Sequence, residues 1–257
     1  MRILVRAVYT IALPAVLIGI WWVATLNSTS FYVPEPAELW TTGVDTWAGE
    51  RFGSDVLPSL ARFLIGTAAA IVLGVAFGLL IGSVRWVRQL TEPLLEFFRA
   101  IPPPVLVPVL MLIVGVNDQM KILVIVSGAI WPVLLNTIEG VRAVDPVLKD
   151  TARTYALTGV TRLRRVVLPS ASPQIAAGVR QCLSIGLILM VISEMFASSS
   201  GLGFTIVVFQ RSFAIPQMWS GIVILGLIGF AMSLLFAACE RRALRWYHGQ
   251  REVQHGR

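Results

Sequence analysis

The fold class is decided by one stretch of the sequence, LARFLIGTAAAIVLGVAFGLLI at residues 60–81. These 22 positions contain a single charged residue, Arg62. A helix needs roughly 20 apolar residues to cross the hydrocarbon core of a bilayer, which is about 30 Å thick. The stretch therefore predicts a membrane-spanning helix.

Further apolar segments meet or approach the same length, and they cover residues 7–26, 101–116, 122–138, 175–196 and 219–239. Only 14% of the 257 residues are charged, against about a quarter in soluble domains. The run at residues 7–26 ends without a small-residue cleavage site, so it predicts a retained span and not a signal peptide. The predicted fold is an all-α membrane protein with six transmembrane helices, forming a single domain over residues 1–257.

The short segments at 101–116 and 122–138 are separated by Asn117-Asp118-Gln119, which favours a turn and therefore a helical hairpin. Three consecutive prolines, Pro102 to Pro104, cannot continue a helix and mark a rigid entry into the first of these segments.

The distribution of Lys and Arg predicts the orientation. With the N-terminus in the cytoplasm, 16 of the 21 basic residues fall on the cytoplasmic side and Arg180 falls within a span. The four remaining basic residues, on the outer side, are Arg51, Arg62, Lys121 and Arg211. Because basic residues accumulate in cytoplasmic loops, we expect a multi-pass membrane protein with both termini in the cytoplasm.

Several functional classes are disfavoured by the same residues. The net charge of +7 could suggest a nucleic-acid partner, but the basic residues flank apolar runs instead of forming an exposed stripe. Cys182 and Cys239 lie in apolar segments, and neither they nor His248 and His255 have metal-ligand spacing. We therefore expect no nucleic-acid partner and no cofactor in this chain.

The loop between the fourth and fifth spans, residues 139–172, carries the most informative pattern. Asp145-Pro146 predicts a helix start, residues 147–158 are predicted to be helical, and Gly159 is predicted to cap the helix end. A second short helix is expected from Thr161 to near Pro169. Leu148, Ala152 and Tyr155 share one face of the first helix. That face either docks on the bundle or another protein, or lies on lipid headgroups.

The same loop resembles the EAA loop of ABC importer permeases. The resemblance rests on Asp150-Thr151-Ala152 followed by Val166-x-Leu168-Pro169 at the family spacing. The chain departs from the motif at two positions, because Thr151 replaces the first alanine and Ala156 stands at the glycine position, with Gly159 three residues later.

Other segments are similar to the nitrate, sulfonate and taurine type of these permeases. The resemblance runs from about Leu60 to Trp246, and the stretches that carry it are RAIPP (99–103), LLNT (134–137), PQI (173–175), GVR (178–180), GLGF (201–204) and ERR (240–242). It implies a core permease region at residues 57–246 with a cytoplasmic coupling loop at residues 145–169.

In that family the EAA helix docks in a groove of a separate ATPase. The resemblance implies a second permease copy (a homodimer), two ATP-binding subunits, an external solute-binding protein and a lipid environment. It assigns coupling to Asp150, Thr151, Ala152, Tyr155, Ala156, Gly159, Leu168 and Pro169. The chain has no P-loop sequence and only two lysines, Lys121 and Lys149, so it is not expected to hydrolyse ATP.

Two charged residues in the fifth span are candidates for the translocation path or gate. Arg180 can snorkel to the cytoplasmic face or serve the pore or a helix contact, and a charge at the centre of a span is costly. Glu194 is a gate candidate or a carboxylate at the headgroup level. The alternative function is a self-sufficient secondary transporter or channel, but the chain shows no cluster of central acids or internal repeat typical of a carrier. The expected cargo is a small solute, most consistent with an organic or inorganic anion.

Overall fold

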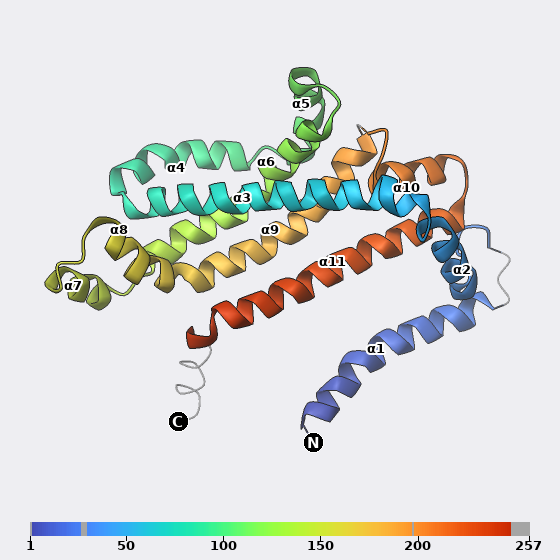
Figure 1. The fold of residues 1–257 in the computed structure, drawn as a ribbon, viewed down its shortest axis with the longest axis horizontal. Helices are drawn as coiled ribbons and strands as arrows, with labels where there is room; N and C mark the ends of the chain where they lie inside the picture. Colours follow the sequence, from blue (N-terminus) through green and yellow to red (C-terminus); the bar gives the residue numbers. More distant parts are fainter. Residues whose placement is uncertain (1, 27–29, 197, 248–257) are drawn as a thin grey trace. The chain divides into compact units, whose positions relative to one another are not determined.

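The computed structural model describes residues 2–26, 30–196 and 198–247, with side chains described from residue 12 onward. Every regular element in these residues is helical, as Figure 1 shows. The all-helical class is therefore confirmed. The chain divides into two compact units, Met1–Pro58 with Ser199–Leu227, and Ser59–Ser198 with Ile228–Arg257.

The first unit contains α1 (Arg2–Thr25), α2 (Pro36–Trp47), a π-helical turn (Phe52–Val56), α10 (Leu202–Arg211) and the beginning of α11 (Ile215–Ala243). Two indole N–H groups join its segments. Trp219 donates to the Tyr32 carbonyl at 2.9 Å, and Trp47 donates to the Ser220 hydroxyl at 2.8 Å. The sequence analysis assigned no helix to the segments that form α2 and α10.

In the second unit, α3 (Leu57–Ser83) and α6 (Asp118–Arg142) pack along a row of glycines. A Cβ placed on Gly78 would lie 2.5 Å from the Cβ of Thr137, so only glycine allows this approach. The contact repeats at pairs that are all 59 positions apart: Gly66–Ile125, Gly74–Val133, Gly78–Thr137 and Gly82–Val141. A constant offset means that α3 and α6 run in the same direction.

Helix α9 (Leu168–Phe196) runs antiparallel to α6. Gly140, late in α6, lies beside Ala171, early in α9. Gly178, later in α9, lies beside the carbonyl of Pro132, which comes earlier in α6. The last part of α11 is antiparallel to α9, since Gly229 lies beside Leu187 and Glu240 pairs with Arg180. The loop between α6 and α9 and the end of α11 therefore lie toward the same end of this unit.

Because α3 and α6 are parallel, the chain must return along the bundle between Ser83 and Asp118. The return consists of α4 (Arg85–Arg99), a 3₁₀ turn (Pro103–Val105) and α5 (Leu106–Val114). Leu95 packs near Leu134, and Pro103 lies beside Gly128, where a Cβ would be 2.6 Å from its Cγ. The segment thus moves toward the start of α6 as it advances, with a bend of 74° at the proline run.

Among the described residues, four helices are long and apolar enough to cross a membrane, and the bent return segment would make five. The four are Phe52–Ser83, Asp118–Arg142, Gly159–Phe196 and Ile215–Ala243. The predicted third span at 101–116 must be corrected, because α5 has only nine residues and the prolines before it interrupt the helix. In α1, the part with described side chains, Ala12–Thr25, is shorter than a span.

The sequence predicts a short helix that ends near Pro169, but the structure has no helix end there. The helix is continuous from Gly159 to Phe196, through α8 (Gly159–Arg162), a π-helical segment (Leu163–Val167) and α9. Proline has no N–H and its ring displaces the carbonyl four residues earlier. The π-helical segment holds that carbonyl, at Arg165, in a wider turn. The same arrangement precedes Pro58, where the π-helical turn Phe52–Val56 ends two residues earlier.

Candidate functional site

The predicted coupling loop begins with the expected helix start. The Asp145 carboxylate accepts a hydrogen bond of 2.7 Å from the Val147 backbone N–H, and Pro146 is the first residue of α7 (Pro146–Thr154). This N-cap satisfies one of the free amides of the first turn. Proline costs nothing at the first position, because a backbone N–H there would have no acceptor within the helix. The local sequence is sufficient to begin the helix at this point.

The end of α7 differs from the prediction. The helix stops at Thr154, and Ala156 adopts φ 51, in the left-handed region. The Leu157 amide donates to the Ala152 carbonyl at 2.8 Å, and the Ala156 amide donates to the Arg153 carbonyl at 2.9 Å. These two bonds form a Schellman motif with Ala156 at the position that glycine usually holds. The cap is therefore Ala156 and not Gly159, which has φ 52 at the start of α8.

The residues with predicted coupling roles divide by exposure. Asp150, Thr151, Tyr155, Ala156, Gly159 and Pro169 are exposed, and Leu168 is half-buried. Ala152 is only 2% exposed and lies inside the chain's own fold. The face proposed to contain Leu148, Ala152 and Tyr155 is therefore split, because the first and last of these are exposed while Ala152 faces inward.

Four large apolar side chains of the loop and of the helix that follows it are exposed. We define the apolar patch as Val147, Leu148, Tyr155 and Val160. Tyr155 is 75% exposed and Val147 is 70% exposed. Large apolar side chains that are exposed on one segment are candidates for contact with a partner or a membrane. The patch is thus the part of the loop best suited to docking.

The two charged residues predicted for the fifth span occupy different environments. The Arg180 guanidinium forms an ion pair with Glu240 of α11, so it makes an interhelical contact and is also largely exposed. Glu194 has no exposed surface. Its predicted role as a gate therefore depends on the groups that bind its carboxylate.

Glu194 belongs to a charge network that we define as Ser59, Arg62, Asp118, Lys121 and Glu194. Arg62 Nη1 lies 2.7 Å from Glu194 Oε1, and the Ser59 hydroxyl lies 2.7 and 2.8 Å from the two oxygens of the same carboxylate. Arg62 Nε also donates to Asp118 Oδ1 at 2.8 Å, and Lys121 Nζ lies 3.4 Å from that oxygen. Two positive and two negative groups are thus balanced within one cluster, and only the Asp118 side chain is well exposed.

The charge network joins the first turns of α3 and α6 to the last turn of α9. It lies at the end of the second unit opposite the loop with α7, because α6 and α9 are antiparallel. The sequence prediction placed Arg62 and Lys121 among the outer basic residues and did not assign them to the site. Arg62 was detectable as the only charge within the apolar run 60–81.

The fold is that of an all-helical membrane protein with an exposed helical loop at one end of its second unit. The model of the family of binding-protein-dependent transport system inner membrane components matches residues 70–245. The chain belongs to this family. It is the permease subunit of an ABC importer, and ATP hydrolysis resides in a separate subunit.

Relatives of known designation cover most of the chain. The taurine transport system permease protein of Escherichia coli is 30% identical over 243 residues, which span 92% of this chain and 88% of that protein. The putative aliphatic sulfonates permease of Bacillus subtilis is 32% identical, over 91% of this chain and 86% of its own. The bicarbonate transport system permease of Synechococcus elongatus is 30% identical, over 74% of this chain and 68% of its own.

A solved structure shares the fold. The inward-facing form of the MetNI methionine ABC transporter contains a chain that matches with a TM-score of 0.63. The match covers 73% of this chain and 94% of that chain, at 19% identity. It therefore supports the helical architecture and carries no information on cargo.

Proposed function

We propose that the apolar patch and the exposed motif residues of the loop form the contact with the ATP-binding subunit. The observation that carries this proposal is the exposure of Val147, Leu148, Tyr155 and Val160 on a loop that also carries the acid-small-small motif. Exposed residues Asp150, Thr151, Ala156 and Gly159 contribute to the docked surface. Ala152 supports the contact from beneath, since it packs against the chain itself.

In this proposal the chain crosses the membrane six times, with α4 and α5 together forming one bent crossing. The contacts of Leu95 and Pro103 along α6 support a return from one end of the bundle to the other. The excess of Lys and Arg around the loop supports its location in the cytoplasm, with both termini. The charge network would then face the outer side.

The assembly that we propose contains two permease copies, two ATP-binding subunits and an external solute-binding protein. Closure of the ATPase pair moves the docked loops. Since the helix Gly159–Phe196 is continuous with the loop, that movement reaches Glu194 at the opposite end. Arg180, paired with Glu240, ties α11 to the same helix. The permease chain itself requires no cofactor.

We propose a small solute with an oxyanion group as the cargo. The named relatives handle taurine, aliphatic sulfonates and bicarbonate, and all of these carry an anionic oxygen group. Uptake of labelled taurine, methanesulfonate and bicarbonate by cells with and without the chain tests this. The chain should be required for uptake of one of them, and equal uptake of all three in its absence contradicts the assignment.

The docking proposal is tested by purifying the full chain with an affinity tag from its own membranes. An ATP-binding subunit should copurify in equal amounts. Tyr155→Asp and Val160→Asp place a charge in a surface expected to be desolvated, so each should reduce the recovered ATPase by about tenfold or more.

The matched control is Gln89→Asp, which makes the same change of charge at an exposed position of α4 outside the loop. It should leave the yield of ATPase unchanged. Full recovery with both loop variants would show that the patch is not the docking surface. Transport by the purified chain alone would instead favour a self-sufficient carrier.

A further inference from the structure

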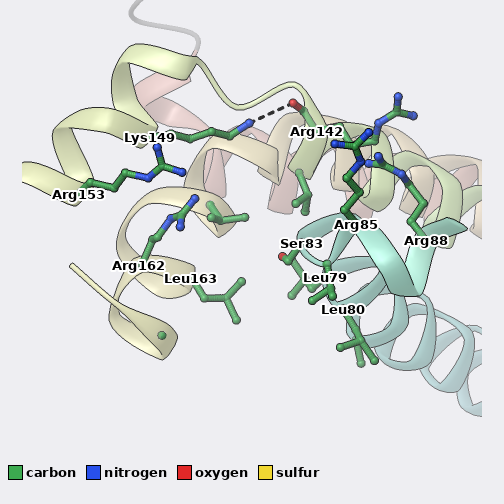
Figure 2. A pocket seen from close by; sticks show the side chains of 16 residues that line it. Leu79, Leu80, Ser83, Arg85, Arg88, Arg142, Lys149, Arg153, Arg162 and Leu163 are labelled. Carbon is green, nitrogen blue, oxygen red and sulfur yellow. Dashed lines mark hydrogen bonds between the residues drawn. The ribbon is translucent and has the colours of Figure 1, made fainter. Parts of the chain in front are cut away.

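A pocket of about 960 Å³ lies in the second unit, beside the coupling loop. We define the basic pocket by its six cationic lining residues, which are Arg85, Arg88, Arg142, Lys149, Arg153 and Arg162. Its other lining residues include no acid. Figure 2 shows Arg85 and Arg88 on one side, facing Lys149, Arg153 and Arg162 across the opening.

The positive charge of the basic pocket is only partly compensated. Arg142 pairs with Glu139 at 2.6 Å and Arg153 pairs with Asp150 at 3.2 Å. Within the described part of the chain, the other four cations have no carboxylate within 4.0 Å, and Lys149 only donates to the Arg142 carbonyl at 3.4 Å. Like charges held this close repel one another, so an anion in the pocket would relieve an unfavourable field.

One atom of the basic pocket already lacks a partner. The Arg162 Nε–H is buried and has no hydrogen-bond acceptor in the described residues. A buried donor left unsatisfied costs free energy, and guanidinium groups pair especially well with phosphate oxygens. The pocket thus offers a donor as well as a positive field to an incoming anion.

Apolar residues lie directly beneath the cations. Leu79, Leu80 and Leu163 line the lower part of the pocket in Figure 2. Leu80 is also on the outer surface of α3, where Val72, Ala76 and Leu80 follow one another at intervals of four residues and are all exposed. Residues spaced in this way form one stripe along a helix. The stripe leads from the pocket along a membrane-spanning helix.

We propose that the basic pocket binds the phosphate headgroup of an anionic phospholipid, with an acyl chain along the stripe of Val72, Ala76 and Leu80. A free phosphate would use the cations but not the stripe. Basic pockets between membrane helices bind anionic lipid headgroups on the cytoplasmic side. The leaflet follows from the proposed orientation, whereas the binding does not depend on it or on transport. Lipid in this pocket contacts α7, α8 and α3 together, so it would hold the coupling loop against the bundle.

Native mass spectrometry of the purified full chain tests the proposal with two probes, phosphatidylglycerol and phosphatidylcholine. The wild-type chain should retain phosphatidylglycerol in preference. The double change Arg85→Gln with Arg162→Gln should weaken its retention by about tenfold or more, and Arg162→Gln alone by roughly fivefold. Arg162→Lys keeps the charge and should retain most of the lipid.

The matched control is Arg164→Gln with Arg165→Gln, which removes two exposed arginines that are adjacent in sequence and do not line the pocket. Its retention of phosphatidylglycerol should remain within about twofold of wild type. Equal losses in the two double variants would overturn the proposal in favour of general surface charge. If the double pocket variant fails to elute as a folded protein, Arg162→Gln and Arg162→Lys decide the question.

Two further experiments distinguish a lipid from other possible occupants of the basic pocket. Inorganic phosphate in large molar excess should not displace the lipid, because phosphate cannot contact the stripe of Val72, Ala76 and Leu80. Thermal protection by phosphate without any retained lipid would overturn the lipid assignment in favour of a free anion. Displacement of phosphatidylglycerol by the ATP-binding subunit would show that the pocket is a protein interface. None of these readouts involves transport, so they are independent of the proposed cargo and coupling.

Discussion

Arg62 and Glu194 form a buried ion pair, with 2.7 Å between Arg62 Nη1 and Glu194 Oε1. The pair joins α3 to the last turn of α9 across 132 positions of sequence. Burying either charge alone would be strongly unfavourable, but each neutralises the other, and the Ser59 hydroxyl and the Asp118 carboxylate form further hydrogen bonds with the pair. The charge network therefore connects α3, α6 and α9 at the end of the second unit opposite the loop with α7.

The first prediction concerns this pair. Glu194→Gln keeps the shape of the side chain but leaves Arg62 without its buried counter-charge, and it should cost about 3 kcal/mol of stability. Thermal unfolding of the full chain in detergent measures the loss. The double variant Arg62→Met with Glu194→Met should be more stable than Arg62→Met alone, because it leaves no buried charge unpaired. If the destabilisation by Arg62→Met and by Glu194→Met simply added up in the double variant, the two residues would not be energetically coupled.

The second prediction concerns the glycine row between α3 and α6. Gly78→Ala would place a Cβ 2.5 Å from the Cβ of Thr137, so the helices must separate, at a cost of about 1–3 kcal/mol. Gly226→Ala is the control, because no neighbouring atom lies within 4 Å of its Cβ position. A lower unfolding temperature is expected only for the first variant. Equal stability of both would mean that the row does not determine the helix spacing.

The third prediction concerns the end of α7. Ala156→Gly should stabilise the loop by up to about 1 kcal/mol, because glycine adopts positive φ without the steric cost that alanine has there. Amide hydrogen exchange of residues 155–158 should slow. Ala143→Gly serves as the control at an exposed position with φ −74, where the same change removes a side chain without relieving strain. Faster exchange in Ala156→Gly would contradict the assigned cap.

The fourth prediction tests the return of the chain between α3 and α6. In a variant without Cys182 and Cys239, a cysteine at Val116 should react with a membrane-impermeant reagent from outside the cell. A cysteine at Ser83, the last residue of α3, should react only after permeabilisation. The reason is that α3 and α6 are parallel, so the chain must cross between them. Labelling of both positions from the same side would exclude a crossing by α4 and α5.

The apolar runs that form α3, α6, α9 and α11, and the start of α7, were predictable from the sequence. Asp145-Pro146 encodes a helix start through the Asp145 N-cap and the fixed φ of Pro146, and residues 60–81 encode a span through their composition. The helix end at Ala156 was missed because glycine is the usual signal for a left-handed cap, and Gly159 lay close by. The continuation through Pro169 was missed because a proline in a helical pattern usually ends or kinks the helix, whereas the π-helical segment before Pro169 accommodates its ring.

By itself, the sequence determined that the chain is a bundle of membrane helices with a patterned loop between two of them, since these properties depend on residues close together in the chain. Only the tertiary structure decided which side chains meet. It paired Arg62 with Glu194, placed Thr137 against Gly78, turned Ala152 inward and gathered six cations around one pocket. Such contacts depend on the direction and spacing of helices that are distant in sequence. Hydrophobic periodicity describes each helix separately and therefore cannot specify its neighbours.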